Sequence, residues 1–309
     1  MAALVETMMY VRQVPWHGLG TQVETAPTSA DAIKLAGLDW IVEPKPIYDA
    51  SGNEIPNYKA NTRNSDNSVL GIVTDRYKIV QNSEAFAFTD ELLKSDSSVK
   101  YETAGSLRNG KQVWLLAKME DRKILGDEVD PYLCFTNTHD GSGSIKVCVT
   151  PVRVVCSNTL NLALEQASRS WTTKHIGDMS YKFDEARRTL GFAAEYMDAL
   201  EKEADVLANT KVSNSYLEQI IDIMYPITPE TSERKLRNIQ QMKENIYMCY
   251  NMEDIKKFKD TAWGAVNAVS DFVSHISPSR MTTTYMANNW GKIMVGHPML
   301  DLAYKNINS

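Results

Sequence analysis

The residues best suited to chemistry gather where a predicted strand leads into a predicted helix. The segment from Asn137 to Leu164 reads NTHDGSGSIKVCVTPVRVVCSNTLNLAL. Its Gly/Ser-rich tip is typical of a hairpin turn, although backbone N–H groups in such a tip can also hold an anion. The polar residues that follow are typical of a helix N-cap, which can likewise hold an anion. The candidate anion-binding residues are His139, Gly141, Gly143, Ser157 and Asn158.

Cations alternate with other residues in two predicted strands. Arg153 lies between two valines, and Arg76 and Lys78 flank Tyr77 in the run TDRYKIV. Residues two apart in a strand share a face, so each strand presents its cations on one side. An arginine in this setting can be solvated, paired with a carboxylate or directed at a phosphate. If the sheet brings the two strands together, one basic face results.

A basic surface with aromatic side chains is the combination that binds single-stranded nucleic acid. The net charge of −6 opposes such binding, since residues 1–168 hold 16 basic and 21 acidic residues. Strong, purely electrostatic binding is not expected, and any binding must rely on a local basic groove. The residues predicted to contact phosphates or to stack on bases are Arg76, Lys78, Lys146, Arg153, Tyr77 and Trp114.

No known catalytic pattern accompanies these residues. The sequence lacks GxSxG, HExxH and Walker A motifs. Its five histidines are scattered singly, and its four cysteines form no CxxC pair, whereas a zinc site needs about four nitrogen or sulfur ligands at close spacing. We therefore expect a protein that is not an enzyme and that holds no metal and no cofactor.

Turn and cap signals predict an α+β first half. Asn109-Gly110 between two extended runs predicts a β-hairpin, because a two-residue turn needs positive φ at both positions. A second hairpin is predicted with its tip at residues 140–144. Thr28 and Asn82 are the predicted N-caps of two short helices. These elements predict an antiparallel or mixed sheet that carries short helices.

The second half has a helical pattern throughout. Apolar residues recur at steps of three and four from Phe183 to Leu207, which predicts one long heptad-patterned helix. Further helices are predicted from Thr228 and in SYLEQIIDIM, DTAWGAVNAVSDFVSHI and MLDLAYKNI. We therefore predict a β-rich α+β domain over residues 1–170 and a helical domain over residues 171–309.

The heptad stripe has two possible partners. It can pack within its own domain, or it can pair with another chain. Together with sheet edges that must be covered or paired, it predicts a homo-oligomer. The candidate interface residues are Leu190, Met197 and Leu200. The sequence has no apolar stretch of eighteen residues and no signal-peptide pattern, so we expect no membrane association and a cytoplasmic location in a bacterial host.

Four blocks of the sequence resemble a known family. They are PWHGLG, LGIVTDRYKIVQNSEAF, the stretch from NTHDGSGS to TPVRVVCSNTLNLAL, and TAWGAVNAVSDFVSH. In this order they resemble the uncharacterised phage/plasmid-like proteins with domain of unknown function 932. The resemblance implies a gene of a prophage, phage or plasmid, and it brings no established activity.

The predicted order of elements also resembles phage single-strand annealing proteins of the Red-beta and Erf type. The resemblance implies rings that hold single-stranded DNA in a basic groove. Our first hypothesis is a non-enzymatic protein that binds or anneals single-stranded DNA in replication or recombination. The alternative is an oligomeric phage protein that binds a host or defence protein through its helical half and binds no nucleic acid.

Overall fold

A computed structural model of the chain describes residues 5–11, 20–25, 27–92, 100–153, 170–190, 193–275 and 302. The chain divides into two compact units. Unit 1 contains residues 1–120, 132–149 and 168–192, and unit 2 contains residues 121–131, 150–167 and 193–309. The fold is α+β with a helical second half, as the sequence predicts.

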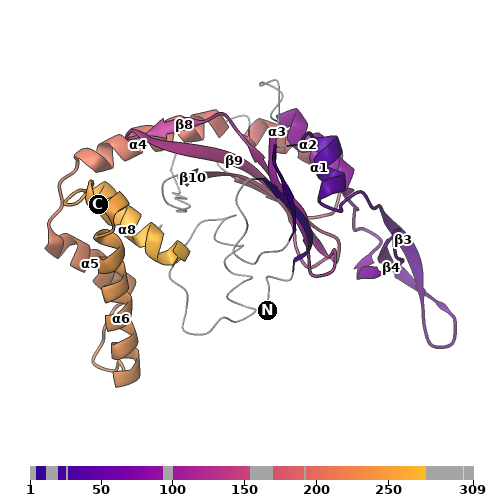
Figure 1. Cartoon of the computed structure of the whole chain (residues 1–309). Helices are drawn as coiled ribbons and strands as arrows, with labels where there is room; N and C mark the ends of the chain where they lie inside the picture. The colour runs from indigo at the N-terminus through magenta and orange to yellow at the C-terminus, as the bar shows by residue number, and fades with distance from the viewer. Residues whose placement is uncertain are drawn as a thin grey trace. The chain divides into compact units, whose positions relative to one another are not determined.

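Unit 1 contains most of a large mixed sheet. Its strands follow the spatial order β11, β10, β9, β7, β6, β1 and β2, while β8 pairs with β9. Figure 1 labels β8, β9 and β10 of this sheet. β1 pairs with β2 in parallel and with β6 antiparallel. The strands are β1 (Val5–Val11), β2 (Thr21–Val23), β6 (Lys100–Leu107), β7 (Gln112–Lys118), β8 (Arg122–Ile124), β9 (Asp127–Thr138), β10 (Ile145–Arg153) and β11 (Ser170–Thr173).

Three helices accompany this sheet in unit 1. They are α1 (Ser29–Leu35), α2 (Asn82–Leu92) and α3 (Met179–Leu190). α1 contacts β1 and β6, α2 contacts β7, and α3 contacts β11. Aromatic residues fill the space between, since Phe88 of α2 packs edge-on against Phe135 of β9 and also contacts Phe183 of α3. Burial of these rings stabilises the arrangement of helices on the sheet.

A second, three-stranded antiparallel sheet belongs to unit 1. It consists of β3 (Val42–Tyr48), β4 (Glu54–Arg63) and β5 (Val69–Thr74), with β4 in the centre. Asn61 and Val73 are buried on its inner face, whereas Tyr58 and Ile72 are 49% and 61% exposed on its outer face. The prolines of VEPKPIY lie on β3, an edge strand, where a missing N–H disrupts no ladder.

Both predicted hairpins are confirmed. β6 and β7 pair around Asn109-Gly110, with Leu107 opposite Gln112. The turn has four residues rather than two, because Arg108 also takes a positive φ, of 53°. The second hairpin joins β9 to β10 through the predicted tip.

The predicted short helices are present as α1 and α2. Thr28 precedes α1, but its hydroxyl donates to the Asp31 carboxylate at 3.1 Å rather than capping a backbone N–H. α2 begins at Asn82, and the carboxylate of Glu84 accepts the Gln81 N–H at 2.6 Å. The side chain that serves the start of α2 is therefore Glu84 and not the predicted Asn82.

Unit 2 is largely helical. Its helices are α4 (Ala193–Asn209), α5 (Asn214–Met224), α6 (Glu233–Tyr250), α7 (Glu253–Lys256) and α8 (Ala262–His275). α8 contacts α4, α6 and α7, and it buries Trp263, Val266 and Val269. Lys257 also donates to the buried Asp127 carboxylate of β9. The predicted helices SYLEQIIDIM and DTAWGAVNAVSDFVSHI are thus present, while MLDLAYKNI lies almost wholly outside the described residues.

The predicted helix start at Thr228 is wrong. The Thr231 N–H donates to the Thr228 carbonyl at 2.9 Å, which closes a turn. Ser232 then caps α6, because its hydroxyl accepts the Lys235 N–H at 3.4 Å. The helix begins at Glu233, after the proline rather than with it.

A single helix over the heptad stripe is not confirmed. The stripe falls on α3 and α4, which belong to different units. The predicted boundary between residues 170 and 171 also differs from the division of these units. β11 lies in unit 1 because it pairs with β10, with Val147 opposite Trp171, whereas residues 121–131 lie in unit 2.

Candidate nucleic-acid interface

Arg76 and Lys78 lie in a loop and not in the predicted strand. β5 ends at Thr74, and the Tyr77 N–H donates to the Thr74 carbonyl at 2.9 Å, so the chain turns there. We call residues 75–78 the basic loop. Both cationic side chains are exposed, and no ion pair joins either of them to a described residue. Two cations therefore project from a turn at the end of the small sheet.

Tyr77 anchors the basic loop from inside. It is 7% exposed, and its hydroxyl donates to the Thr138 carbonyl of β9. Its ring stacks on His175 with 4.4 Å between centroids and an interplanar angle of 13°. Burial raises the pKa of Tyr77, so the phenol remains protonated as a donor. The prediction that Tyr77 stacks on bases is wrong, because the side chain is buried and its hydroxyl is already bonded within the protein.

His175 fixes the other end of the loop. The Lys78 N–H donates to the His175 carbonyl at 2.7 Å, and His175 Nδ1 donates to the Lys78 carbonyl at 2.9 Å. A carbonyl only accepts, so the proton must lie on Nδ1. Burial lowers the pKa of His175, which keeps the ring neutral. The basic loop is thereby tied to the residues that follow β11.

Side-chain amides hold the segment that follows the loop. Asn137 Nδ2 donates to the Val80 carbonyl at 2.9 Å. The Gln81 amide both accepts from and donates to the backbone of Val42, each at 2.9 Å. Lys59 reaches back from β4 and donates to the Tyr77 carbonyl at 3.0 Å. The loop is therefore preorganised, and its cations lose little backbone freedom on binding a ligand.

His139 is a buried structural residue. Its ring is fully buried, with Nε2 3.1 Å from Asn82 Oδ1 and the ring edge-on to Trp40 at 5.3 Å. Burial lowers its pKa to about 3. The neutral ring carries no positive charge toward an anion, which argues against the predicted role of His139. Asn61 Nδ2 donates to the His139 carbonyl at 2.8 Å, which ties the residue after β9 to the small sheet.

The Gly/Ser tip is held by its own carboxylate. Asp140 accepts from the N–H of Ser142 at 2.9 Å and from its hydroxyl at 2.6 Å. Gly141 takes a positive φ of 76°, and a Cβ on Gly143 would lie 2.8 Å from Thr138 Cγ2. Turn geometry therefore accounts for these glycines. The Asp140 carboxylate already accepts the Ser142 N–H that an anion would need. Two other residues of the predicted anion site, Ser157 and Asn158, lie outside the described residues.

The sheet does not join the predicted basic strands. β5 pairs with β4, whereas β10 pairs with β9 and β11. Lys146 of β10 is half-buried and lies opposite Thr172 of β11, close in sequence to the residues that bind the basic loop. The backbone of Arg153 ends β10, and its side chain is not among those described.

Trp114 does not offer a stacking surface. It is 7% exposed, and its Nε1 donates to Thr103 Oγ1 at 3.3 Å. It packs over Gly105, where a Cβ would lie 2.5 Å from the tryptophan ring. Cross-strand packing, not ligand binding, explains this residue, so the prediction for Trp114 is wrong.

The structure adds three residues that the sequence did not single out. Lys174 is exposed next to His175, and Lys182 Nζ donates to the Lys174 carbonyl at 2.8 Å. Tyr58 is 49% exposed on β4, opposite Thr74. Its position on the outer face follows from alternation along NYKANTR, which is the signal that sequence reasoning had available. The proximity of Lys174, Lys182 and Tyr58 to the basic loop depends on tertiary contacts, which the sequence alone does not show.

Two of the three predicted interface residues of the stripe are buried within the chain. Met197 and Leu200 are 2% and 0% exposed, and α4 packs against α8 and β8. They cannot contact a second chain without opening this packing, so the prediction is wrong for these two residues. The side chain of Leu190 is not among those described.

The described parts of the chain offer neither a metal site nor a membrane-spanning helix. They contain no group of three or more His, Cys, Asp or Glu side chains arranged to hold a metal ion. None of the helices described there is long and apolar enough to cross a membrane.

Comparison with known proteins assigns the chain to a family. We found no significant match among curated proteins or among solved structures. A family model described as a domain of unknown function, DUF932, matches residues 69–290. The match begins at the first residue of β5 and includes the basic loop, its anchoring residues Thr138 and His175, and most of the helical unit. Because it extends over well more than half of the chain, the protein belongs to the DUF932 family.

Proposed function

We propose that the protein binds nucleic acid without catalysing a reaction, and that the basic loop contacts phosphates. The observation that carries the proposal is the exposure of Arg76 and Lys78 on a loop whose backbone is fixed on both sides of Tyr77. Exposed cations on a preorganised loop bind phosphates with little loss of conformational freedom. DNA of a phage or plasmid, in replication or recombination, is the proposed target.

The charge distribution limits how such binding can occur. The whole chain carries −6, so a diffuse basic field is absent and a local group of cations must act alone. Lys174 and Lys182 lie close to the His175 backbone that holds the loop. Asp75 and Asp140 are acidic neighbours that reduce the local potential. The proposal therefore predicts modest affinity with a clear dependence on salt.

A titration of labelled oligothymidylate by fluorescence anisotropy tests the proposal. We expect wild-type protein to bind at micromolar concentration at about 50 mM salt, within the range of non-specific binding. The double variant Arg76→Ser/Lys78→Ser should bind several-fold more weakly. Both side chains are exposed, so the variant should keep the far-UV circular dichroism of the wild type.

A matched variant controls for the change in total charge. Arg234 and Lys235 are exposed near the start of α6, in unit 2. Arg234→Ser/Lys235→Ser removes the same two charges and should leave binding unchanged. Equal weakening by both double variants would show that only net charge matters, and no binding by the wild type would refute the proposal.

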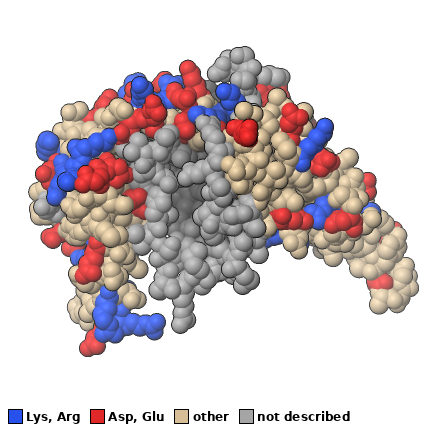
Figure 2. Space-filling model, viewed as in Figure 1, with Lys and Arg blue, Asp and Glu red and all other residues tan. Residues whose placement is uncertain are grey.

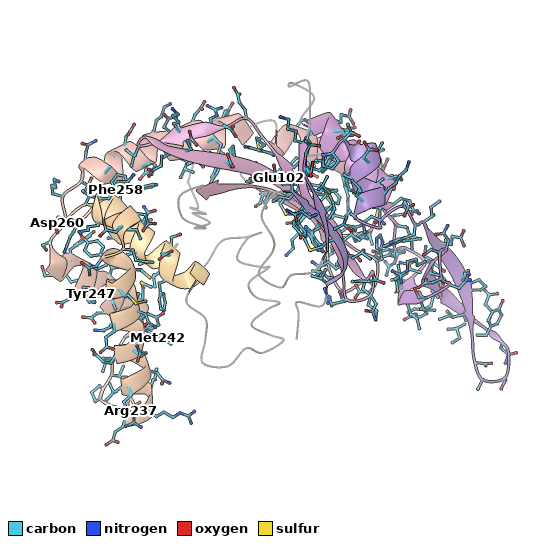
Figure 3. All side chains as sticks on the ribbon, viewed as in Figure 1. Glu102, Arg237, Met242, Tyr247, Phe258 and Asp260 are labelled. Carbon is cyan, nitrogen blue, oxygen red and sulfur yellow. The ribbon has the colours of Figure 1, made fainter. Side chains whose placement is uncertain are left out.

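A second candidate function is protein interaction through the helical unit. α6 exposes Met242 and Met248, at 36% and 55%, and Ile223 of α5 is 44% exposed. Figure 3 shows Met242 between Arg237 and Tyr247 along α6. Exposed methionines adapt to varied apolar partners. A second copy of the chain, or a host or defence protein, is the proposed partner.

Light scattering at several concentrations tests the self-association form of this candidate. Met248→Glu should lower the mass of an oligomeric wild type, while Gln241→Glu, at an exposed position on the same helix, should leave it unchanged. A wild type that is monomeric at every concentration would exclude self-association and leave a different protein as the partner.

A further inference from the structure

The outer face of the small sheet places an exposed aromatic ring beside the basic loop. Tyr58 lies on β4, the central strand, and pairs with Thr74, the last residue of β5. Arg76 follows two residues later. The side chain of Tyr58 is exposed, at 49% for the residue, and it makes no hydrogen bond or ring contact with another described residue. Its ring is therefore open to a ligand.

The two neighbours of Tyr58 in sequence hold the basic loop in place. The Asp75 N–H donates to the Asn57 carbonyl at 3.1 Å. Lys59 Nζ donates to the carbonyls of Tyr77 and Asp75 at 3.0 and 3.5 Å. Lys59 points to the inner face of β4, so Tyr58 points to the outer face. The backbone that carries the ring and the backbone of the basic loop are thus held together by contacts on both sides of Tyr58.

The surface around the ring is apolar with a cation near it. Ala60 follows Tyr58 on the outer face, where it is only 6% exposed and lies between Ile72 of β5 and Lys45 of β3 in the strand register. Ile72 is 61% exposed. Figure 2 shows that the end of the β3–β4 hairpin is mostly uncharged, with charged residues nearer its base. A flat apolar ring beside cations complements a base that is joined to phosphates.

We propose that Tyr58 stacks on an unpaired base while Arg76 and Lys78 hold the adjoining phosphates, so that the site selects single-stranded over double-stranded nucleic acid. The inference rests on the proposed phosphate-binding role of the basic loop and adds the class of nucleic acid. In a duplex the faces of the bases are covered by their neighbours, and the ring has nothing to stack on. Only the contacts to phosphates would then remain.

Substitutions at Tyr58 separate stacking from phosphate contact. We expect Tyr58→Leu to weaken binding of labelled oligothymidylate by roughly 5- to 140-fold, the effect of losing one base–aromatic stack. Tyr58→Phe should retain the wild-type affinity, because the ring rather than the hydroxyl makes the contact. Binding of a labelled duplex should be the same for Tyr58→Leu and the wild type.

Tyr48→Leu is the matched control. Tyr48 is 57% exposed on the same hairpin, opposite Glu54 and away from the basic loop. It should leave affinity for the single strand unchanged. If Tyr58→Leu binds like the wild type while Arg76→Ser/Lys78→Ser binds weakly, stacking is refuted and the phosphate site stands. If the wild type binds neither probe, the phosphate site itself is refuted.

Discussion

The rings of Tyr77 and His175 lie face to face, with 4.4 Å between their centroids. This stack joins the loop after β5 to the residues after β11, and the Tyr77 hydroxyl extends the connection to the Thr138 carbonyl of β9. Three segments that are distant in sequence therefore meet at one side chain. The exposed cations on either side of Tyr77 owe their fixed positions to it.

Two substitutions of Tyr77 should separate the contribution of its ring to stability from that of its hydroxyl. Tyr77→Phe loses one hydrogen bond and should lower the free energy of unfolding by about 1 kcal/mol. Tyr77→Ala removes the whole buried ring and should lower it by about 3–5 kcal/mol. Urea unfolding followed by circular dichroism measures both. Equal losses in the two variants would show that the stack on His175 contributes little.

Stability should decrease at acidic pH because two histidines are buried in the neutral state. Burial lowers the pKa of His139 to about 3 and also lowers that of His175, from an ordinary value of 6.5. Below pH 6.5 the unfolded chain binds protons that the folded chain does not, so the free energy of unfolding decreases as the pH falls toward 3. Each histidine contributes at most about 1.4 kcal/mol per pH unit.

The variant His139→Gln tests this dependence. Its amide can still donate to Asn82 Oδ1 but does not titrate. Between pH 6.5 and 3.8 its stability should depend less on pH than that of the wild type. Asp66 and Asp178, whose pKa values are lowered by hydrogen bonds, lose stabilising charge only below their ordinary value of 3.8. An unchanged slope in this window would mean that His139 is protonated in the folded protein.

The close contact between β5 and the hairpin tip should make Gly71 intolerant of a side chain. A Cβ at Gly71 would lie 2.4 Å from the Cα of Asp140, which is backbone and cannot rotate away. Gly71→Ala should lower the free energy of unfolding by about 1–3 kcal/mol. Ile72→Thr, at a 61% exposed position on the same strand, should change it by less than about 0.5 kcal/mol. Equal shifts of the two variants in thermal unfolding would contradict a tight contact between Gly71 and the tip.

The apolar stripe on α4 should behave in unfolding experiments as part of the hydrophobic core of unit 2. Leu200 is fully buried, so Leu200→Glu should abolish cooperative unfolding of unit 2 or lower its stability severely. Val206 is 57% exposed on the same helix, and Val206→Glu should have little effect. Calorimetry and circular dichroism distinguish the two. A stable Leu200→Glu protein of reduced mass would restore the stripe as an interface between chains.

The sequence predicted the elements whose signals are local. Asn109-Gly110 marked a hairpin because positive φ is a property of the turn itself. The helices α5 and α8 followed from apolar periodicity. Each of these predictions depended on residues only a few positions apart.

The candidate site could not be predicted in the same way. TDRYKIV has the alternation of a strand, yet Tyr77 turns inward because its hydroxyl reaches Thr138, 61 positions away. His139 has a common turn sequence around it, and only its contact with Asn82, 57 positions away, shows that it is core. Burial of polar residues by partners distant in sequence leaves no periodic signal. Tyr58 is brought next to the basic loop only by the pairing of β4 with β5, in which it lies opposite Thr74.

The salt dependence of oligothymidylate binding tests the central claim most directly. Anisotropy titrations between about 50 and 200 mM salt give the slope of log K against log salt concentration, which is roughly −0.7 for each phosphate contacted on a single strand. Arg76→Ser/Lys78→Ser should reduce the magnitude of this slope by about 1.4, since two phosphate contacts are lost. The same slope in the variant and the wild type would contradict a role for the basic loop in binding nucleic acid.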